Sequence, residues 1–316
     1  MNRTEPTPIH GIRYYQPPKD AILTGLDGSV SIPYADIPIP LLEEDYNALD
    51  GVCPSYDVVG RGIYQALRTN PDCILAGRYA KLLKEAYPHY LSELASHILM
   101  LEHKDVEVSY LDRKINYLKI FALIEPENPQ FPLEIGVTLL DRGMRLSALH
   151  LSTVTLYRAE VFLRRALQLS PDHVTVRNKL GEVCYILGKY QDAAQFWHGI
   201  LPALDGEEAQ KLEVRLESIA EKRLPQIPAV DYLEAVGAAF SLFDQGKFEE
   251  AAAIFQDIIG DTFFCDQFSI PEIYYFLGLC CVNMNMPRYA EEYLKEALQL
   301  NPDYQDARNA LAQLYQ

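Results

Sequence analysis

The sequence predicts an all-α solenoid of antiparallel helix pairs that follows a proline-rich, non-helical N-terminal arm. Three observations support this prediction. The pattern Ala-Leu-x-x-(Asn or Ser)-Pro-Asp, called the closing phrase below, recurs at the ends of amphipathic segments. Small residues recur at helical spacing within those segments, and prolines are frequent in the first fifty residues. Helix pairs that repeat in this way stack into arrays, because each pair buries its apolar face only against its neighbours.

Residues 1–50 are expected to form an extended arm. Proline lacks a backbone N–H and clashes with the preceding helical turn, so long helices are excluded here. The prolines are Pro6, Pro8, Pro17, Pro18, Pro33, Pro38 and Pro40. Because the segment is also rich in tyrosine, leucine and isoleucine, we expect it to pack on the solenoid. A disordered arm that binds a partner is the alternative.

Residues 51–130 are expected to continue the stack as degenerate helical repeats. Length and apolar periodicity predict helices over about 55–69, 73–86, 89–103 and 107–124. The first of these ends in the closing phrase Ala66–Asp72, which is repeated with small changes at Ala166–Asp172 and Ala297–Asp303. In each copy an Asn-Pro or Ser-Pro pair ends the helix, because proline restricts the residue before it.

Residues 131–207 and 231–316 carry the most regular repeats. The segment 271–304 has Leu277-Gly278 in its first helix and Ala290, Leu294 and Ala297 in its second. The segments 174–207 and 232–265 share a Gly-Lys-aromatic turn at Gly188 and Gly246, but both lack the closing proline. Residues 305–316 are expected to form a final capping helix.

These segments resemble the 34-residue tetratricopeptide repeat (TPR), in which a Leu-Gly pair is followed by alanine, a bulky residue, alanine and proline. A fourth repeat runs from about residue 133 to Pro171 and holds about eleven residues more than the family pattern, placed near 144–154. The insertion either lengthens a helix or forms a loop over one face. Residues 208–230 are expected to form an extra helix and a proline-containing linker, with a bend or subdomain boundary near 224–230.

Charge is distributed unevenly along the chain. The net charge is −16, and residues 201–316 hold 8 basic and 20 acidic residues. This acidity disfavours nucleic acid as a partner and favours a basic or apolar one. A solvated helical surface that its carboxylates keep soluble is the alternative. No stretch has the apolar length of a membrane helix, and no secretory signal is recognised at the start, so we expect a cytoplasmic protein without membrane contact.

No pattern typical of catalysis is found. The six cysteines form no C-x-x-C pair, the seven histidines form no metal-binding spacing, and no phosphate-binding loop or nucleophile elbow occurs. We therefore expect neither a cofactor nor a metal ion, and no enzymatic activity.

The resemblance implies a binding groove on the concave face, lined by fixed positions of each first helix. The candidate peptide-binding residues are Tyr185, Leu233, Phe240, Phe243, Tyr275, Leu279, Val282 and Asn283. The basic clamp with which some family members hold a terminal carboxylate is missing at the groove positions. The groove therefore suits a protein or peptide segment that is apolar with basic flanks. Coverage of these residues by neighbouring repeats, by the arm or by a second copy is the alternative.

Three functional hypotheses follow. The first is a non-catalytic scaffold or chaperone-like adaptor that binds a protein segment along the concave face. The second is a self-assembling structural protein, since a homo-oligomer is possible. The third is an accessory substrate-recognition subunit of an enzyme complex.

Overall fold

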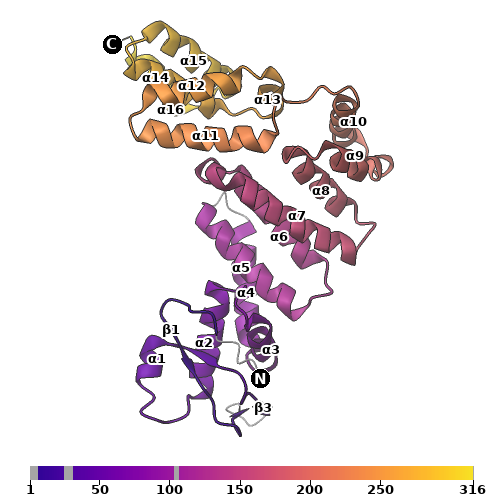
Figure 1. The fold of residues 1–316 in the computed structure, drawn as a ribbon, viewed down its shortest axis with the longest axis vertical. Helices are drawn as coiled ribbons and strands as arrows, with labels where there is room; N and C mark the ends of the chain where they lie inside the picture. Colours follow the sequence, from indigo (N-terminus) through magenta and orange to yellow (C-terminus); the bar gives the residue numbers. More distant parts are fainter. Residues whose placement is uncertain (1–5, 25–30, 103–106, 316) are drawn as a thin grey trace. The chain divides into compact units, whose positions relative to one another are not determined.

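The computed structural model describes residues 6–24, 31–102 and 107–315, and within these ranges the chain is mainly helical (Figure 1). It divides into two compact units, Met1–Thr138 with Gln168–Ser170, and Leu139–Leu167 with Pro171–Gln316. The division falls within a helix, between Thr138 and Leu139, and residues 224–230 belong to the second unit. Among the described helices, none is long and apolar enough to cross a membrane.

The first unit begins with four short strands, so the expected extended arm is not confirmed in that form. Strand β1 (Ile12–Tyr15) pairs antiparallel with β4 (Ile39–Leu42), and β2 (Ile22–Thr24) pairs with β3 (Ser31–Pro33). The five-residue helix α1 (Glu43–Asn47) follows. The prolines do keep long helices out of this segment, as expected.

Strand β4 packs on the first long helix, α2 (Tyr56–Thr69). Ile39 and Leu41 of β4 are fully buried, and the Tyr79 hydroxyl donates a hydrogen bond to the Pro38 carbonyl oxygen at 2.6 Å. The N-terminal segment is therefore part of the folded unit.

Three further helices of the first unit agree closely with the expected helical runs. They are α3 (Ala76–Ala86), α4 (Pro88–Glu102) and α5 (Val108–Ile124). Arg68 at the end of α2 donates a hydrogen bond to the Tyr117 hydroxyl on α5, and Lys119 pairs with Asp72 across a 2.5 Å contact. These bonds fix the closing phrase of α2 against α5. Helix α6 (Gln130–Met144) then leads from the first unit into the second.

In the second unit the insertion becomes the 3₁₀ helix η1 (Leu146–Leu151) and the start of the eighteen-residue helix α7 (Ser152–Leu169). Helices α8 (Val174–Ile186) and α9 (Tyr190–His198) form the next pair. A short 3₁₀ turn η2 (Leu201–Ala203) and the helix α10 (Gly206–Ala220) follow, and α10 lies near the place where an extra helix is expected.

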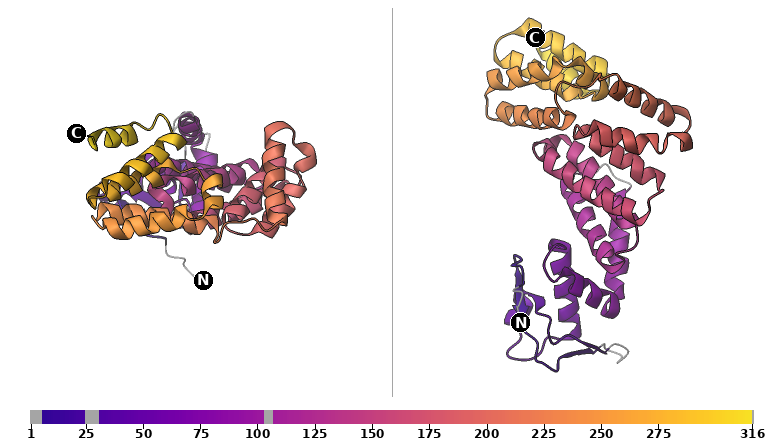
Figure 2. Two further views of the ribbon diagram at one scale, coloured as in Figure 1. Left: turned by 90° about the horizontal axis from the view of Figure 1, so that it is seen from above. Right: turned by 45° about the vertical axis from the view of Figure 1, so that its right-hand side comes forward.

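The C-terminal repeats comprise α11 (Ala229–Asp244), α12 (Phe248–Ile259), the short α13 (Thr262–Gln267), α14 (Pro271–Asn283), α15 (Pro287–Leu300) and the final α16 (Gln305–Gln313). The orange and yellow helices of these repeats lie next to one another in both views of Figure 2.

Close helix packing explains the small residues of the repeat. A Cβ atom on Gly278 would lie 2.9 Å from Cγ of Leu294, and Ala290 is fully buried. The turn glycines Gly188 and Gly246 have φ angles of 74° and 77°, a left-handed conformation that glycine adopts at little cost. The small residues at the predicted repeat positions therefore allow the paired helices to pack closely.

Candidate functional site

A row of aromatic side chains connects the first helices of the last two repeats. The ring of Phe276 on α14 lies 4.7 Å from that of Phe240 and 5.0 Å from that of Phe243, both on α11. Tyr275 extends the row, since its ring lies 5.1 Å from Phe276 and 5.0 Å from Tyr304. We call these five residues the aromatic surface. All five are partly exposed, so the row is accessible at its surface.

Helical periodicity places these residues on one side. Phe240 and Phe243 are three residues apart on α11 and therefore share a face. Helix α14 packs beside α11, and Phe276 of α14 contacts both phenylalanines. Contacts at 4.5–7 Å between ring centroids are favourable for aromatic pairs, each contributing about 0.5–1.5 kcal/mol. The row is thus held by its own packing.

The other candidate groove residues have different surroundings. Leu279 is partly buried, whereas Val282 and Asn283 are exposed at the end of α14. Tyr185 and Leu233 are each only 1% exposed and lie in the core. The hydroxyl of Tyr185 donates to Gln267 Oε1 at 2.7 Å, and the Arg215 guanidinium lies over its ring. Helices α10 and α13 therefore cover a position that the repeat pattern assigns to the groove.

The residues predicted from the sequence for this surface do not include Phe276, Tyr304 or the insertion. Phe276 is the sixth residue of its helix, between the positions that the family pattern uses. Tyr304 follows the closing Asn-Pro pair of the last repeat and precedes α16. A run of adjacent aromatic residues at Tyr274, Tyr275 and Phe276 is the signal that could have found the first of them.

Beside the aromatic surface the insertion forms the wall of a cavity of about 400 Å³. Its lining comes from η1, α11 and α14 and comprises Leu146, Ser147, His150, Gly237, Phe240, Ser241, Asp244 and Phe276. The volume lies within the range of about 300–1,000 Å³ that is usual for small-ligand pockets.

The insertion is fixed on α11 at two points. Ala148 and Leu149 of η1 are buried, and the absence of a side chain at Gly237 lets the backbone of His150 approach α11. At the start of α7, the backbone N–H of Thr153 donates to Glu234 Oε1 at 2.8 Å. The cavity wall is therefore a packed element of the second unit.

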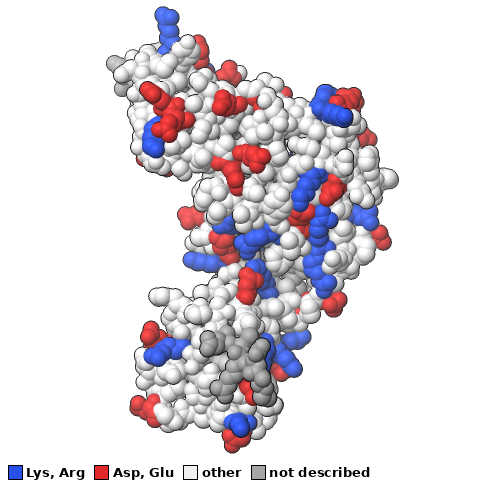
Figure 3. All heavy atoms as spheres, in the orientation of Figure 1, with Lys and Arg blue, Asp and Glu red and all other residues white. Residues whose placement is uncertain are grey.

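Acidic groups surround the aromatic surface. Burial raises the pKa of Tyr275, and the negative charge of Asp306 raises it further. The pKa of Tyr304 is raised by burial and by Glu272, Tyr275 and Asp306. Red spheres outnumber blue ones over the C-terminal helices on the face drawn in Figure 3. A negative potential at this surface favours cationic groups.

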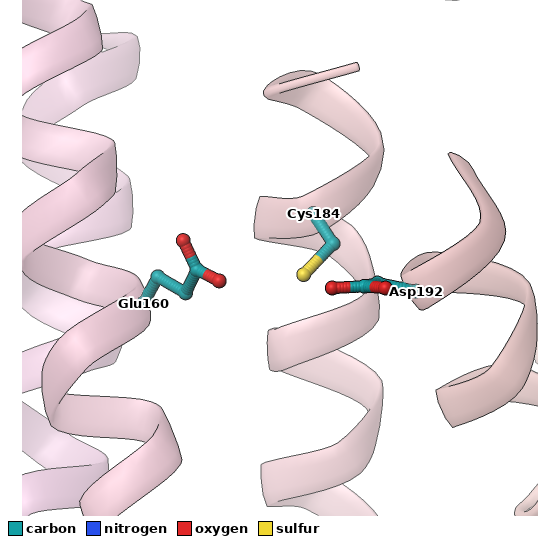
Figure 4. Close-up of side chains that lie close together, drawn as sticks. All are labelled: Glu160, Cys184 and Asp192. Atoms are coloured by element: carbon teal, nitrogen blue, oxygen red, sulfur yellow. The ribbon is translucent and has the colours of Figure 1, made fainter. Parts of the chain in front are cut away.

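A second cluster, in the region of α7, α8 and α9, consists of Glu160, Cys184 and Asp192 (Figure 4). Glu160 is buried but accepts hydrogen bonds from Lys189 at 2.6 Å and Arg164 at 2.9 Å. Burial alone opposes its ionisation, yet these two bonds outweigh burial and lower its pKa. Burial raises the pKa of the Cys184 thiol to about 12. The two cationic side chains already neutralise the carboxylate, so the cluster is an ion-pair network and does not fit a metal ion.

Stacked helix pairs, with a partly exposed aromatic row between two first helices, define a mainly helical repeat protein. The family model described as the tetratricopeptide repeat matches residues 271–304, and a second model with the same description matches residues 159–204. The chain therefore contains tetratricopeptide repeats over these residues, which in general terms supports a scaffold for protein interactions.

Comparison with solved structures finds matches among repeat proteins. The structure of YrrB, described as a TPR protein with an unusual peptide-binding site, is 19% identical over 61% of this chain and 96% of its own, with a TM-score of 0.26. The TPR domain of P58(IPK) is 14% identical over 82% of this chain and 64% of its own, with a TM-score of 0.34.

The human IFIT1 dimer, solved with m7Gppp-AAAA, is 15% identical over 86% of this chain and 58% of its own, with a TM-score of 0.28. The chain thus spans less than two thirds of the P58(IPK) and IFIT1 chains. Among curated proteins, none matches the sequence.

Proposed function

We propose that the chain is a non-catalytic scaffold that binds a segment of another protein along the aromatic surface of α11 and α14. The observation that carries this proposal is the partly exposed row Phe243–Phe276–Tyr275–Tyr304. Aromatic side chains supply much of the binding energy at protein interfaces because they bury a large area with few rotatable bonds. This surface belongs to the side that the repeat pattern predicts to be concave.

The carboxylates near the aromatic surface favour one kind of partner segment over another. Glu272 and Asp306 lie near Tyr304, and Asp244 lies at the end of α11. An acidic segment would be repelled by these carboxylates, whereas an apolar segment with basic flanks would pair with them. Such a partner is compatible with a chaperone-like adaptor and with an accessory substrate-recognition subunit.

The test is a pull-down from lysate with the intact chain and with Phe243→Ala/Tyr275→Ala. We expect the double variant to recover less than about a tenth of the partner, because it removes two central aromatic anchors. Tyr289→Ala is the matched control, since Tyr289 is an aromatic residue of the same repeats that is 52% exposed outside the row. Circular dichroism establishes that all variants are folded. Undiminished recovery by the double variant would exclude the aromatic surface as the binding site.

Self-assembly is the second candidate, and exposed apolar side chains on α7 favour it. Val154, Tyr157 and Val161 share one helix face and are 60%, 46% and 66% exposed. Contiguous exposed apolar side chains often mark interaction sites. Light scattering over a range of concentrations separates the candidates: a constant monomer mass contradicts self-assembly, and a mass that falls to the monomer value in Val154→Ser/Val161→Ser supports it.

A further inference from the structure

The cavity beside the insertion is continuous with the aromatic surface. Phe240 and Phe276 contact each other at 4.7 Å and belong to both. A segment lying along the aromatic surface therefore passes the mouth of this cavity. The natural occupant is one side chain of that same segment, so the inference that follows rests on the proposed function.

The charge of the lining restricts which side chain fits. The eight lining residues include one carboxylate, Asp244, and neither lysine nor arginine. Asp244 is exposed at the C-terminal end of α11, where the helix carries a partial negative charge that adds to that of the carboxylate. Phe240 and Phe276 supply aromatic walls, and Ser147 and Ser241 supply hydroxyl groups.

We propose that this cavity is a specificity pocket for an arginine side chain, with Asp244 as the partner of its guanidinium. The aliphatic stem and the planar guanidinium both suit aromatic walls, because a guanidinium stacks on phenyl rings and is attracted to their faces. A carboxylate accepts two parallel N–H bonds from the same group. The serine hydroxyls can accept the remaining donors.

Other side chains satisfy fewer of these conditions. Lysine carries a compact and strongly hydrated charge, which is costly to place against a wall of two phenyl rings. An acidic side chain meets Asp244 and the negative end of α11 and is repelled. A purely apolar side chain fills the walls but removes water from Asp244 without replacing its hydrogen bonds, which costs free energy.

The test begins with selection of a displayed library of random dodecapeptides on the purified full chain. Three forms are used in parallel: the unsubstituted chain, Asp244→Asn, and the control Asp257→Asn. Asp257 is an exposed carboxylate on α12 outside the cavity, so its variant removes the same charge from elsewhere in the same unit. We expect peptides with a recurrent arginine from the unsubstituted chain and from Asp257→Asn, and loss of that arginine from the Asp244→Asn selection.

Calorimetry on one selected peptide then measures the pairing directly. Replacement of its arginine by citrulline, which keeps the shape and removes the charge, should weaken binding to the unsubstituted chain by about tenfold or more. Against Asp244→Asn the two peptides should differ by less than about twofold, because the coupled carboxylate is gone. This double comparison separates a contact with Asp244 from general attraction to an acidic surface.

The remaining outcomes of the selection and the calorimetry decide separately on the arginine pocket and on the proposed function. Equal arginine enrichment on all three forms, or an equal citrulline effect on both, overturns the assignment of the pocket. Selected peptides that lack arginine but lose binding to Phe243→Ala/Tyr275→Ala overturn the inference and leave the proposed function standing. Failure to select any peptide on any form overturns both.

Discussion

Gly237 on α11 lies directly against the backbone of His150 in the insertion. A Cβ atom at Gly237 would stand 2.8 Å from the His150 nitrogen and 3.1 Å from the Leu149 Cβ. A separation below 3 Å from a backbone atom leaves no room for a methyl group. Glycine at this position therefore permits the insertion to pack on α11 and to form the cavity wall.

Gly237→Ala should destabilise the second unit by about 1–3 kcal/mol, the usual cost of overpacking a close contact. Urea denaturation followed by Trp197 fluorescence measures this effect, because Trp197 is the single tryptophan and is fully buried in that unit. An unchanged midpoint would contradict the packing of the insertion on α11.

The control is Gly77→Ala, followed by circular dichroism. Gly77 is also within a helix, α3, but has no atom within 4 Å of a built Cβ. Gly77 lies in the first turn of α3, and alanine is favoured over glycine in helices, so this variant should stabilise the first unit by up to about 0.5 kcal/mol. The two substitutions are identical in chemistry and should differ in sign.

Glu234 is the second attachment of the insertion to α11. Its carboxylate accepts the Thr153 N–H, one of the unpaired donors in the first turn of α7. Glu234→Ala should cost about 0.5–2 kcal/mol, in the range of lost helix caps. Glu234→Gln keeps an acceptor oxygen and should cost less. Hydrogen exchange at Thr153 reports the bond, and equal exchange in all three proteins would show that it does not form in solution.

The helices and their pairing could be predicted from the sequence because their signals are local. The Asn-Pro and Ser-Pro pairs of the closing phrases end α2, α7 and α15, and Gly278 opposite Leu294 follows from a fixed repeat spacing. The strands could not be predicted in this way. Strand β1 pairs with β4, more than twenty residues further along the chain, and each strand has four residues. So short a segment carries no distinctive periodicity.

The candidate site was predictable where the repeats are regular and not where added elements cover them. Phe240, Phe243 and Tyr275 occur at family positions and stay partly exposed. Tyr185 occupies an equivalent position but is covered by α10 and α13, two helices that the repeat pattern does not contain. Leu233 is likewise buried. The pattern assigns a face to a residue, but burial depends on what else packs there.

Glu160 should make the stability of the second unit depend on pH. Hydrogen bonds from Lys189 and Arg164 keep its pKa below the ordinary value of 4.5 despite the burial that opposes ionisation. Its ionised form therefore contributes stability above about pH 4.5, and this contribution is lost as the pH falls through the lowered pKa. Glu160→Gln should cost about 1–2 kcal/mol at pH 7, because it removes the charge that Lys189 and Arg164 bind, while both cations stay partly exposed and Arg164 keeps its pair with Asp192.

The difference between the unsubstituted protein and Glu160→Gln should shrink from pH 7 towards pH 3. Urea denaturation with Trp197 fluorescence at several pH values measures it. Glu207→Gln is the control, since the Glu207 side chain is 89% exposed and its contact with Lys211 should contribute little. A difference for Glu160→Gln that stays constant over this range would contradict the ion-pair network.

Asp261 holds the linker before α11 to the end of the same repeat. This buried carboxylate accepts bonds from the Gln226 N–H at 2.7 Å, the Tyr232 hydroxyl at 2.8 Å and the Phe264 N–H at 3.1 Å. The last of these bonds caps α13, which begins where the family pattern has its closing proline. Burial opposes ionisation of Asp261, but the hydrogen bonds outweigh it and lower its pKa.

Asp261→Ala should cost about 3 kcal/mol or more, because bonds to a charged acceptor contribute about 1.5–3 kcal/mol each and three donors lose theirs. Tyr232→Phe removes one donor and leaves the carboxylate with its two backbone partners, so it should cost only about 1 kcal/mol. Trp197 fluorescence in urea measures both. Equal costs for the two variants would mean that the Tyr232 hydroxyl alone matters and that the linker is not held by Asp261. A larger cost for Asp261→Ala than for Tyr232→Phe would show that the Asp261 carboxylate ends this repeat, where the closing proline is missing, and orients α13.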